Sequence, residues 1–283
     1  MVLVQRDAPY PHWEFSHAAS GDLLRVVPER GGLISGWRSG GRERIYLDLQ
    51  RFQDPQRSVR GGIPVLFPIC GSLPDGVLPL PQGRFALPQH GFARDLPWSL
   101  RPLDDGEGVA MQLEHSAATL ALYPFRFRLE VQWRLQPGSL QISAEVHNLD
   151  EHAMPFSFGL HPYLAIADLA TARFEGLPAR GLDQLSGQPC DNGQQLDLLA
   201  EGIDLLAGPA TAVRLLDPSA AAALELETSA PLDLVVIWSD PPRPMVCMEP
   251  WSAPRGALVS GERRLELAPG TSRRLRSRYR VLA

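Results

Sequence analysis

The chain has 283 residues, of which 44% are hydrophobic and 21% are charged, so it can bury a large core and is not expected to be disordered. Its formal net charge of −5 comes without any sustained run of basic residues, which argues against nucleic acid or an anionic membrane as the main partner. None of its 27 basic residues is a lysine. This excludes Schiff-base and pyridoxal chemistry, as well as a phosphate-loop lysine.

The three cysteines are Cys70, Cys190 and Cys247, which are widely spaced and lack the paired spacing of a metal site. We therefore expect reduced thiols. The first residues reach charge and proline after only a few apolar positions, unlike a signal peptide. No apolar run approaches the length of about 18 residues that a membrane-spanning helix requires. These features predict a soluble cytoplasmic protein.

The first predicted elements are two strands, residues 23–27 and 33–37, joined at Gly31 and Gly32 in a hairpin-like turn. Residues 58–98 follow, a segment so rich in glycine and proline that it is a poor helix and a poor central strand. We expect an ordered loop there. Polar side chains on such loops often form binding sites, because loops on a rigid scaffold carry most binding groups.

The middle of the chain predicts mainly strands. Residues 127–135 and 140–146 alternate between apolar and polar side chains around Pro137-Gly138, which is typical of an antiparallel hairpin with one buried face. Residues 180–210 are expected to be irregular. The other predicted strands are 109–113, 119–123, 212–216, 222–227 and 234–238, and the short apolar run 156–164 carries one histidine.

The last part of the chain predicts two further strands. The apolar run 245–248 leads into Glu249 and Pro250, and we expect the proline to end that strand. From Arg274 onward, arginines alternate with other residues, which favours the solvent face of a final strand over a nucleic-acid site. With no long helical period, repeat or linker, the chain is predicted to be all-β, a large antiparallel β-sandwich forming one domain over residues 1–283.

Glu249 and His161 are the candidates for proton transfer. A carboxylate at the end of a buried strand has a raised pKa and suits acid–base chemistry, whereas one at an exposed strand end does not. Sequence position leaves both readings of Glu249 open. His161 lies in an apolar segment, where a histidine is either a hydrogen-bonded core group or an acid.

Two other polar residues are candidates for the site. His90 lies on the glycine-containing loop between Gln89 and Arg94 and is either a binding or a structural residue; Asp204 is an ordinary turn aspartate by its surroundings. No histidines are paired at metal-site spacing, so we expect no metal. A Gly-x-Ser-x-Gly elbow and a dinucleotide-binding glycine motif are also missing from the sequence.

Four motifs together resemble the aldose 1-epimerase (galactose mutarotase-like) superfamily, and within it the hexose-6-phosphate mutarotase branch. They occur in the family's order and are Val59-Arg-Gly-Gly-Ile-Pro-Val-Leu-Phe-Pro68, Leu87-Pro-Gln-His-Gly-Phe-Ala-Arg94, Phe156-Ser-Phe-Gly-Leu-His-Pro-Tyr163 and Cys247-Met-Glu-Pro-Trp251. The resemblance implies a β-supersandwich and an isomerase that interconverts sugar anomers without a cofactor. The insert at residues 71–84 is longer than the family spacing.

Matched motif by motif, the resemblance implies that Glu249 is the general base and His161 the general acid. It implies substrate-binding roles for Arg60, Gln89 and Arg94, next to which we include His90. Asp204 matches a family aspartate that binds a sugar hydroxyl, although the residues around it differ from the family pattern.

The hypothesis is a hexose mutarotase that acts on a hexose 6-phosphate such as glucose 6-phosphate, with Arg60 and Arg94 near the phosphate, because the arginine fork suits phosphate oxygens. The expected partner is thus a small sugar or sugar phosphate, and the protein is expected to be a monomer or weak dimer. Three alternatives remain open: a mutarotase for unphosphorylated aldoses, a non-catalytic sugar-binding or sensory protein on the same fold, and a glycoside hydrolase that uses Glu249 with Asp204.

Overall fold

The structure is a computed structural model that describes residues 3–282. It is mostly β, with 48% of residues in strands and 10% in helices, which confirms the predicted fold class. Neighbouring strands run antiparallel in the sheets. Within residues 3–282, no helix is long and apolar enough to cross a membrane.

The large sheet has eight strands, and the alternating hairpin predicted from the sequence lies near its centre. In β11 (Phe127–Gln136) every second side chain is buried, and β12 (Ser139–Asn148) pairs with it from Phe127↔Asn148 to Gln136↔Ser139. The order of the sheet is β16 (Arg173–Glu175), β20 (Ala212–Asp217), β21 (Ala222–Thr228), β25 (Ser272–Leu282), β12, β11, β10 (Gly108–Glu114) and β9 (Ser99–Pro102).

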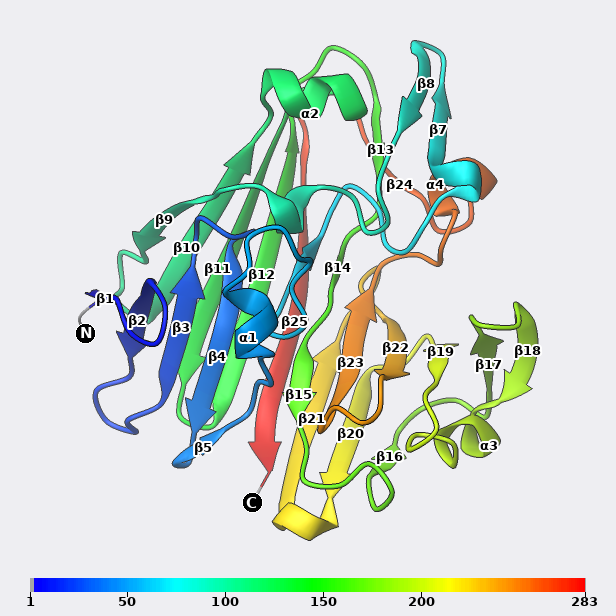
Figure 1. The fold of residues 1–283 in the computed structure, drawn as a ribbon. Helices are drawn as coiled ribbons and strands as arrows, with labels where there is room; N and C mark the ends of the chain where they lie inside the picture. The colour runs from blue at the N-terminus through cyan, green and yellow to red at the C-terminus, as the bar shows by residue number, and fades with distance from the viewer. Residues whose placement is uncertain (1–2, 283) are drawn as a thin grey trace.

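A second eight-stranded sheet, which we call the site sheet, packs against the large sheet. Figure 1 shows β22 and β23 in front of β20 and β21, and the Tyr279 hydroxyl of β25 donates to the Met248 carbonyl of β23 at 2.6 Å. Its order is β18 (Gln188–Asp191), β17 (Arg180–Asp183), β19 (Asp204–Ala207), β22 (Leu234–Ser239), β23 (Met245–Trp251), β14 (Gly159–Leu160) and β6 (Val65–Leu66), with β15 (Tyr163–Ala165) also on β23.

The remaining strands complete the fold. A five-stranded sheet holds the predicted hairpin, β3 and β4, and the other two small sheets are pairs. The strands are β1 (Leu3–Arg6), β2 (His12–Ser16), β3 (Leu23–Val27), β4 (Leu33–Ser39) and β5 (Arg42–Glu43), then β13 (Met154–Phe156) with β24 (Leu265–Leu267), and β7 (Val77–Leu80) with β8 (Gly83–Ala86).

Helices are short in this fold. The α-helices are α1 (Leu49–Phe52), α2 (Ala117–Leu122), α3 (Asn192–Leu196) and α4 (Ala257–Ser260), and the 3₁₀ turns are η1 (Pro74–Gly76), η2 (Ala93–Asp95) and η3 (Pro218–Ala220). The main core lies between the large sheet and the site sheet, where Leu129, Val131 and Val146 of the former meet Val235, Ile237 and Met248 of the latter. One face of the site sheet is therefore buried.

Three predicted elements were wrong. Residues 119–123, predicted as a strand, lie mainly in α2, because Ser116 caps this helix in a capping box with Thr119. Residues 180–210 are not irregular, since they form β17, β18, α3 and β19. The segment 58–98 is only partly loop, because its proline-rich insert folds into the β7–β8 hairpin.

The strand before Glu249 also differs from the prediction, because β23 continues through Pro250 to Trp251. A proline restricts φ to a value compatible with extended backbone and removes only one donor from a ladder. Glu249 therefore lies inside the strand, opposite Val236, instead of at its end. The final strand was correctly predicted: Arg274, Arg276 and Arg280 of β25 are exposed and Leu275 is buried.

Candidate active site

The floor of the candidate site is the face of the site sheet that does not contact the large sheet. Asp204 pairs with Trp238, which pairs with Cys247, and in the next row on the same face Val236 pairs with Glu249. Side chains two residues apart on a strand share a face. The strand register therefore places two carboxylates, Asp204 and Glu249, above the same side of the sheet.

Loops from the segment 58–98 cover this floor and leave a cavity of about 320 Å³. All seven residues predicted from the sequence line it. The lining residues are Ser58, Arg60, Gln89, His90, Arg94, His161, Tyr163, Asp204, Val236, Trp238, Glu249, Trp251 and Arg255. The volume suits a small polar molecule.

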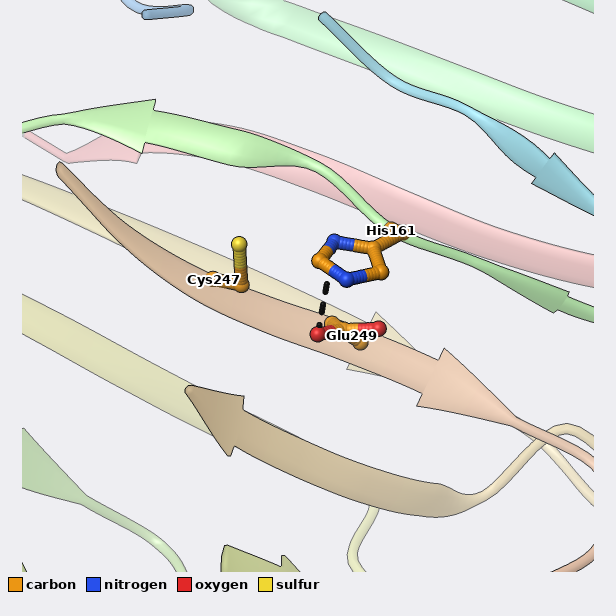
Figure 2. Close-up of side chains that lie close together, drawn as sticks. All are labelled: His161, Cys247 and Glu249. Atoms are coloured by element: carbon orange, nitrogen blue, oxygen red, sulfur yellow. Dashed lines mark ion pairs between the residues drawn. The ribbon is translucent and has the colours of Figure 1, made fainter. Parts of the chain in front are cut away.

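His161 and Glu249 face each other inside the cavity, as Figure 2 shows, with 3.4 Å between the His161 Nδ1 and the Glu249 Oε1. The second carboxyl oxygen of Glu249 accepts a hydrogen bond from the indole Nε1 of Trp251 at 3.0 Å. Tyr163 stacks on the imidazole, with ring centroids 4.8 Å apart. The pair is thus held in a defined geometry, because His161 lies between β14 and β15, which both pair with β23 in the same antiparallel register.

Burial dominates the protonation of this pair. Burial, together with the nearby Asp204 carboxylate, raises the pKa of Glu249 well above its ordinary value. Burial, followed by the charges of Arg94 and Arg60, lowers the pKa of His161 to about 3. Both shifts favour the neutral forms, the protonated carboxyl of Glu249 and the neutral imidazole of His161. The two groups titrate as a pair because they are in contact.

His90 is held by a reciprocal contact with Gly71. The His90 amide donates to the Gly71 carbonyl at 2.7 Å, and the Gly71 amide donates to the His90 Nδ1 at 3.1 Å. Because Nδ1 accepts, the hydrogen of a neutral His90 lies on Nε2. Burial, with the charge of His161, lowers the pKa of His90 well below its ordinary value. His90 is thus a neutral donor within the cavity wall.

Asp204 is bound by protein donors on both oxygens. Gln184 Nε2 donates to its Oδ1 at 2.7 Å, and Arg255 Nη2 donates to its Oδ2 at 2.5 Å. Burial raises the pKa of Asp204, and Arg255 opposes that change. Each carboxylate oxygen has a second lone pair, so Asp204 can still accept a hydrogen bond from a ligand hydroxyl.

Arg60 and Arg94 add positive charge to the cavity wall. The Arg60 guanidinium lies 6.0 Å from the ring centroid of Trp238, and Arg94 donates to the Gln89 carbonyl at 3.0 Å. The carboxylate contact of Arg94 is long, 3.9 Å to Asp95. Both arginines therefore retain hydrogen-bond donors for an anionic ligand, unlike Arg255, which is paired with Asp204.

His161, Cys247 and Glu249, drawn in Figure 2, also offer ligand atoms within 4.8 Å of one another, a spacing that could hold a metal ion. The electrostatics oppose a cation there. Burial, together with the Glu249 charge, raises the pKa of the Cys247 thiol well above its ordinary value, so it stays protonated, and a metal binds the thiolate. Arg60, Arg94 and Arg255 line the same cavity.

Sequence reasoning missed several residues of the cavity. Tyr163 and Trp238 lie on the same sheet row as Asp204, and Trp251 binds Glu249 directly. Alternation along β22 and β23 is the signal that could have found the tryptophans. Arg255 and Gln184 come from loops and carry no local signal.

The model of the aldose 1-epimerase family matches residues 17–280. The chain belongs to the aldose 1-epimerase family. Among curated members, a protein of Escherichia coli K12 described as a putative glucose-6-phosphate 1-epimerase is 29% identical over 178 residues, 62% of this chain and 54% of the relative. A protein of Cenchrus ciliaris with the same description is 29% identical over 159 residues, 52% of this chain and 45% of that relative. The chain thus spans about half the length of the curated relatives it matches.

Similar solved structures extend the likeness to nearly the whole chain. The Slr1438 protein from Synechocystis sp. PCC 6803 is 35% identical, with a TM-score of 0.92, over 99% of this chain and 98% of that one. A galactose mutarotase related enzyme from Lactobacillus acidophilus is 20% identical, with a TM-score of 0.78, over 96% of this chain and 97% of that one. The second likeness concerns the fold alone, and it agrees with the galactose mutarotase-like sandwich implied by the motifs.

Proposed function

We propose that this member of the aldose 1-epimerase family is a hexose mutarotase that interconverts the α and β anomers of a hexose 6-phosphate such as glucose 6-phosphate. The observation that carries the proposal is the contact of His161 with Glu249, 3.4 Å apart, in a cavity lined by two arginines with free donors. Relatives described as putative glucose-6-phosphate 1-epimerases support the choice of substrate.

Ring opening needs one proton removed and one supplied. In the proposed reaction, Glu249 takes the proton of the C1 hydroxyl and His161 donates a proton to the ring oxygen. The bond between C1 and the ring oxygen then breaks, and the C1 carbonyl forms. Rotation about C1–C2 presents the other carbonyl face. Reclosure reverses both transfers, so the reaction consumes no co-reactant and returns the pair to its starting state.

The scheme needs the pair ionised before ring opening, with a proton on His161 and none on Glu249. After ring opening the pair is neutral, with the proton on Glu249. The second arrangement is the one favoured in the sugar-free site by the raised pKa of Glu249 and the lowered pKa of His161, both caused mainly by burial. Positioned acids and bases of this kind are each worth about 10²- to 10⁴-fold in rate.

The phosphate is assigned to Arg60 and Arg94. Their guanidinium groups keep donors free, and planar guanidinium matches the oxygens of a phosphate. The hydroxyls of the sugar are assigned to Gln89, His90 and Asp204. His90 donates through Nε2, and Asp204 accepts.

Anomer exchange followed by proton NMR tests the function. Pure anomers of glucose 6-phosphate, glucose, galactose 6-phosphate and mannose 6-phosphate are mixed with the purified protein, and rates are compared with buffer. We expect at least 10-fold higher kcat/KM for glucose 6-phosphate than for glucose, and Arg60→Gln to lower only the phosphorylated rate strongly. Equal rates for both sugars would reject the phosphate assignment. Sugar binding without acceleration would identify a non-catalytic protein.

A further inference from the structure

Arg255 joins three distant parts of the chain at the cavity wall. It follows β23, its Nη2 donates to Asp204 of β19 at 2.5 Å, and its stem lies against Gly71. Gly71 has a φ of 69°, and a Cβ at this position would lie 2.2 Å from the Arg255 Cγ. A side chain at Gly71 would therefore displace the arginine, and the same glycine also binds His90.

Asp204 depends on this arginine for its place and its charge. The carboxylate is 7% exposed, and a buried carboxylate is costly unless it is paired and hydrogen-bonded. Gln184 supplies one hydrogen bond and Arg255 supplies the compensating charge. Without Arg255, Asp204 would take up a proton more readily and would lose its tether to the loop after β23.

The charge of Asp204 also acts on Glu249, since the two lie in adjacent rows of the same sheet face. Arg255 opposes that effect, so the two charges act on Glu249 with opposite signs. Charged or titratable groups from the other elements around Glu249 are His161, His90, Arg60 and Arg94. Tyr163, Cys247 and Tyr279 are near it as well, and burial keeps all three neutral by raising their pKa values.

We propose that Arg255 is a positioning residue for ring opening. It holds Asp204 in place as the hydroxyl acceptor, and the opposite charges of Arg255 and Asp204 together set the electrostatic field at Glu249 and His161. The proposal rests on the proposed mutarotase function. Without Arg255, Asp204 would lose both a hydrogen bond and the charge that opposes its protonation, so its role as a hydroxyl acceptor depends on Arg255.

The pH dependence of anomer exchange tests this pairing. Arg255→Gln removes a positive charge, so both limbs of the kcat/KM profile should move to higher pH by roughly one unit. Asp204→Asn removes a negative charge and should move them to lower pH, while the double variant should return toward wild type. Arg255→Lys should restore the wild-type limbs. Arg274→Gln, which breaks an exposed pair with Glu145 on the large sheet, is the matched control and should change nothing.

A second readout does not require activity. The Trp251 indole donates to Glu249, so ionisation of Glu249 should change tryptophan fluorescence, and Glu249→Gln identifies that part of the signal by removing it. The pH midpoint of the fluorescence change due to Glu249 should rise in Arg255→Gln and fall in Asp204→Asn. Unchanged fluorescence midpoints in these variants would overturn the inference and leave Arg255 with a purely structural role in its loop. Failure of Arg255→Lys to restore the limbs of the kcat/KM profile would have the same meaning. If the fluorescence midpoints shift but the wild-type protein shows no anomer exchange, the role of the Arg255–Asp204 pair would stand and the mutarotase function would be rejected.

Discussion

The contact between His161 and Glu249 places the two groups of the proposed chemistry side by side. Two groups that are both buried, one acidic and one basic, are each driven toward neutrality because water no longer solvates the charge. Burial therefore favours a protonated carboxyl beside a neutral imidazole, with 3.4 Å between the Glu249 Oε1 and the His161 Nδ1. Trp251 holds the Glu249 carboxyl and Tyr163 holds the His161 imidazole in place, so the proposed proton transfers need little reorganisation of either group.

Replacing either member of this pair should abolish the proposed catalysis. We expect Glu249→Gln and His161→Ala each to lower kcat for anomer exchange by about 10²- to 10⁴-fold, because each removes one proton transfer. Proton NMR with glucose 6-phosphate measures the loss. Glu145→Gln is the control, since Glu145 is a carboxylate on the solvent side of the large sheet. Unchanged rates in either site variant would disprove the assigned role.

Strand alternation decides which side chains reach the site and which reach the core. On β23, Glu249 and Cys247 face the cavity side, while Val246 and Met248 lie in the main core. The same period explains why the sequence identified β11 and β12 correctly. It also explains why α2 was missed: its capping box overrides a short apolar run that reads as a strand.

The alternation of buried and partly exposed side chains along β11 predicts that substitutions at adjacent residues change the stability of the protein by different amounts. Leu129 is 0% exposed and lies in the main core, so Leu129→Ala should cost about 2–5 kcal/mol of unfolding free energy. Arg128→Ala next to it, on the solvent face, should change stability by less than about 0.5 kcal/mol. Urea unfolding monitored by circular dichroism gives both values. Similar losses at both positions would contradict the register.

The molecule as a whole places an acid–base pair on one face of a sheet whose other face stabilises the fold. The cavity is separated from the main core by the site sheet itself, so changes to the proposed catalytic pair need not disturb the packing between the two large sheets. The expected single domain over residues 1–283 and the monomer or weak dimer remain predictions.

The raised pKa of Glu249, caused mainly by burial, predicts how stability changes with pH. The folded state keeps this proton at pH values where the unfolded chain has lost it, so stability falls as pH rises above the unfolded pKa of about 4.3. Gln at 249 stays neutral, accepts from Trp251 and donates toward His161. The melting temperature of Glu249→Gln should therefore equal that of wild type near pH 4 and exceed it by several degrees at pH 8.

Thermal unfolding at both pH values measures this difference, with each kcal/mol worth roughly 2–4 °C. Glu145→Gln provides the comparison, because Arg274 lowers the pKa of Glu145 and the sign is reversed: that variant should lose stability at pH 8. Equal melting temperatures of wild type and Glu249→Gln at pH 8 would show that the carboxyl is not held neutral.

Much of this protein was predictable from local pattern. Period-two alternation identified the central hairpin and the final strand because a half-buried strand must alternate, and four motifs identified the family and seven residues that line the cavity. The remainder depends on contacts between distant residues. The partnership of Gln184 and Arg255 with Asp204, the course of β23 through Pro250, and the contact of His161 with Glu249 arise only when remote segments meet. Burial and charge pairing are properties of the assembled surroundings and not of neighbours in the chain.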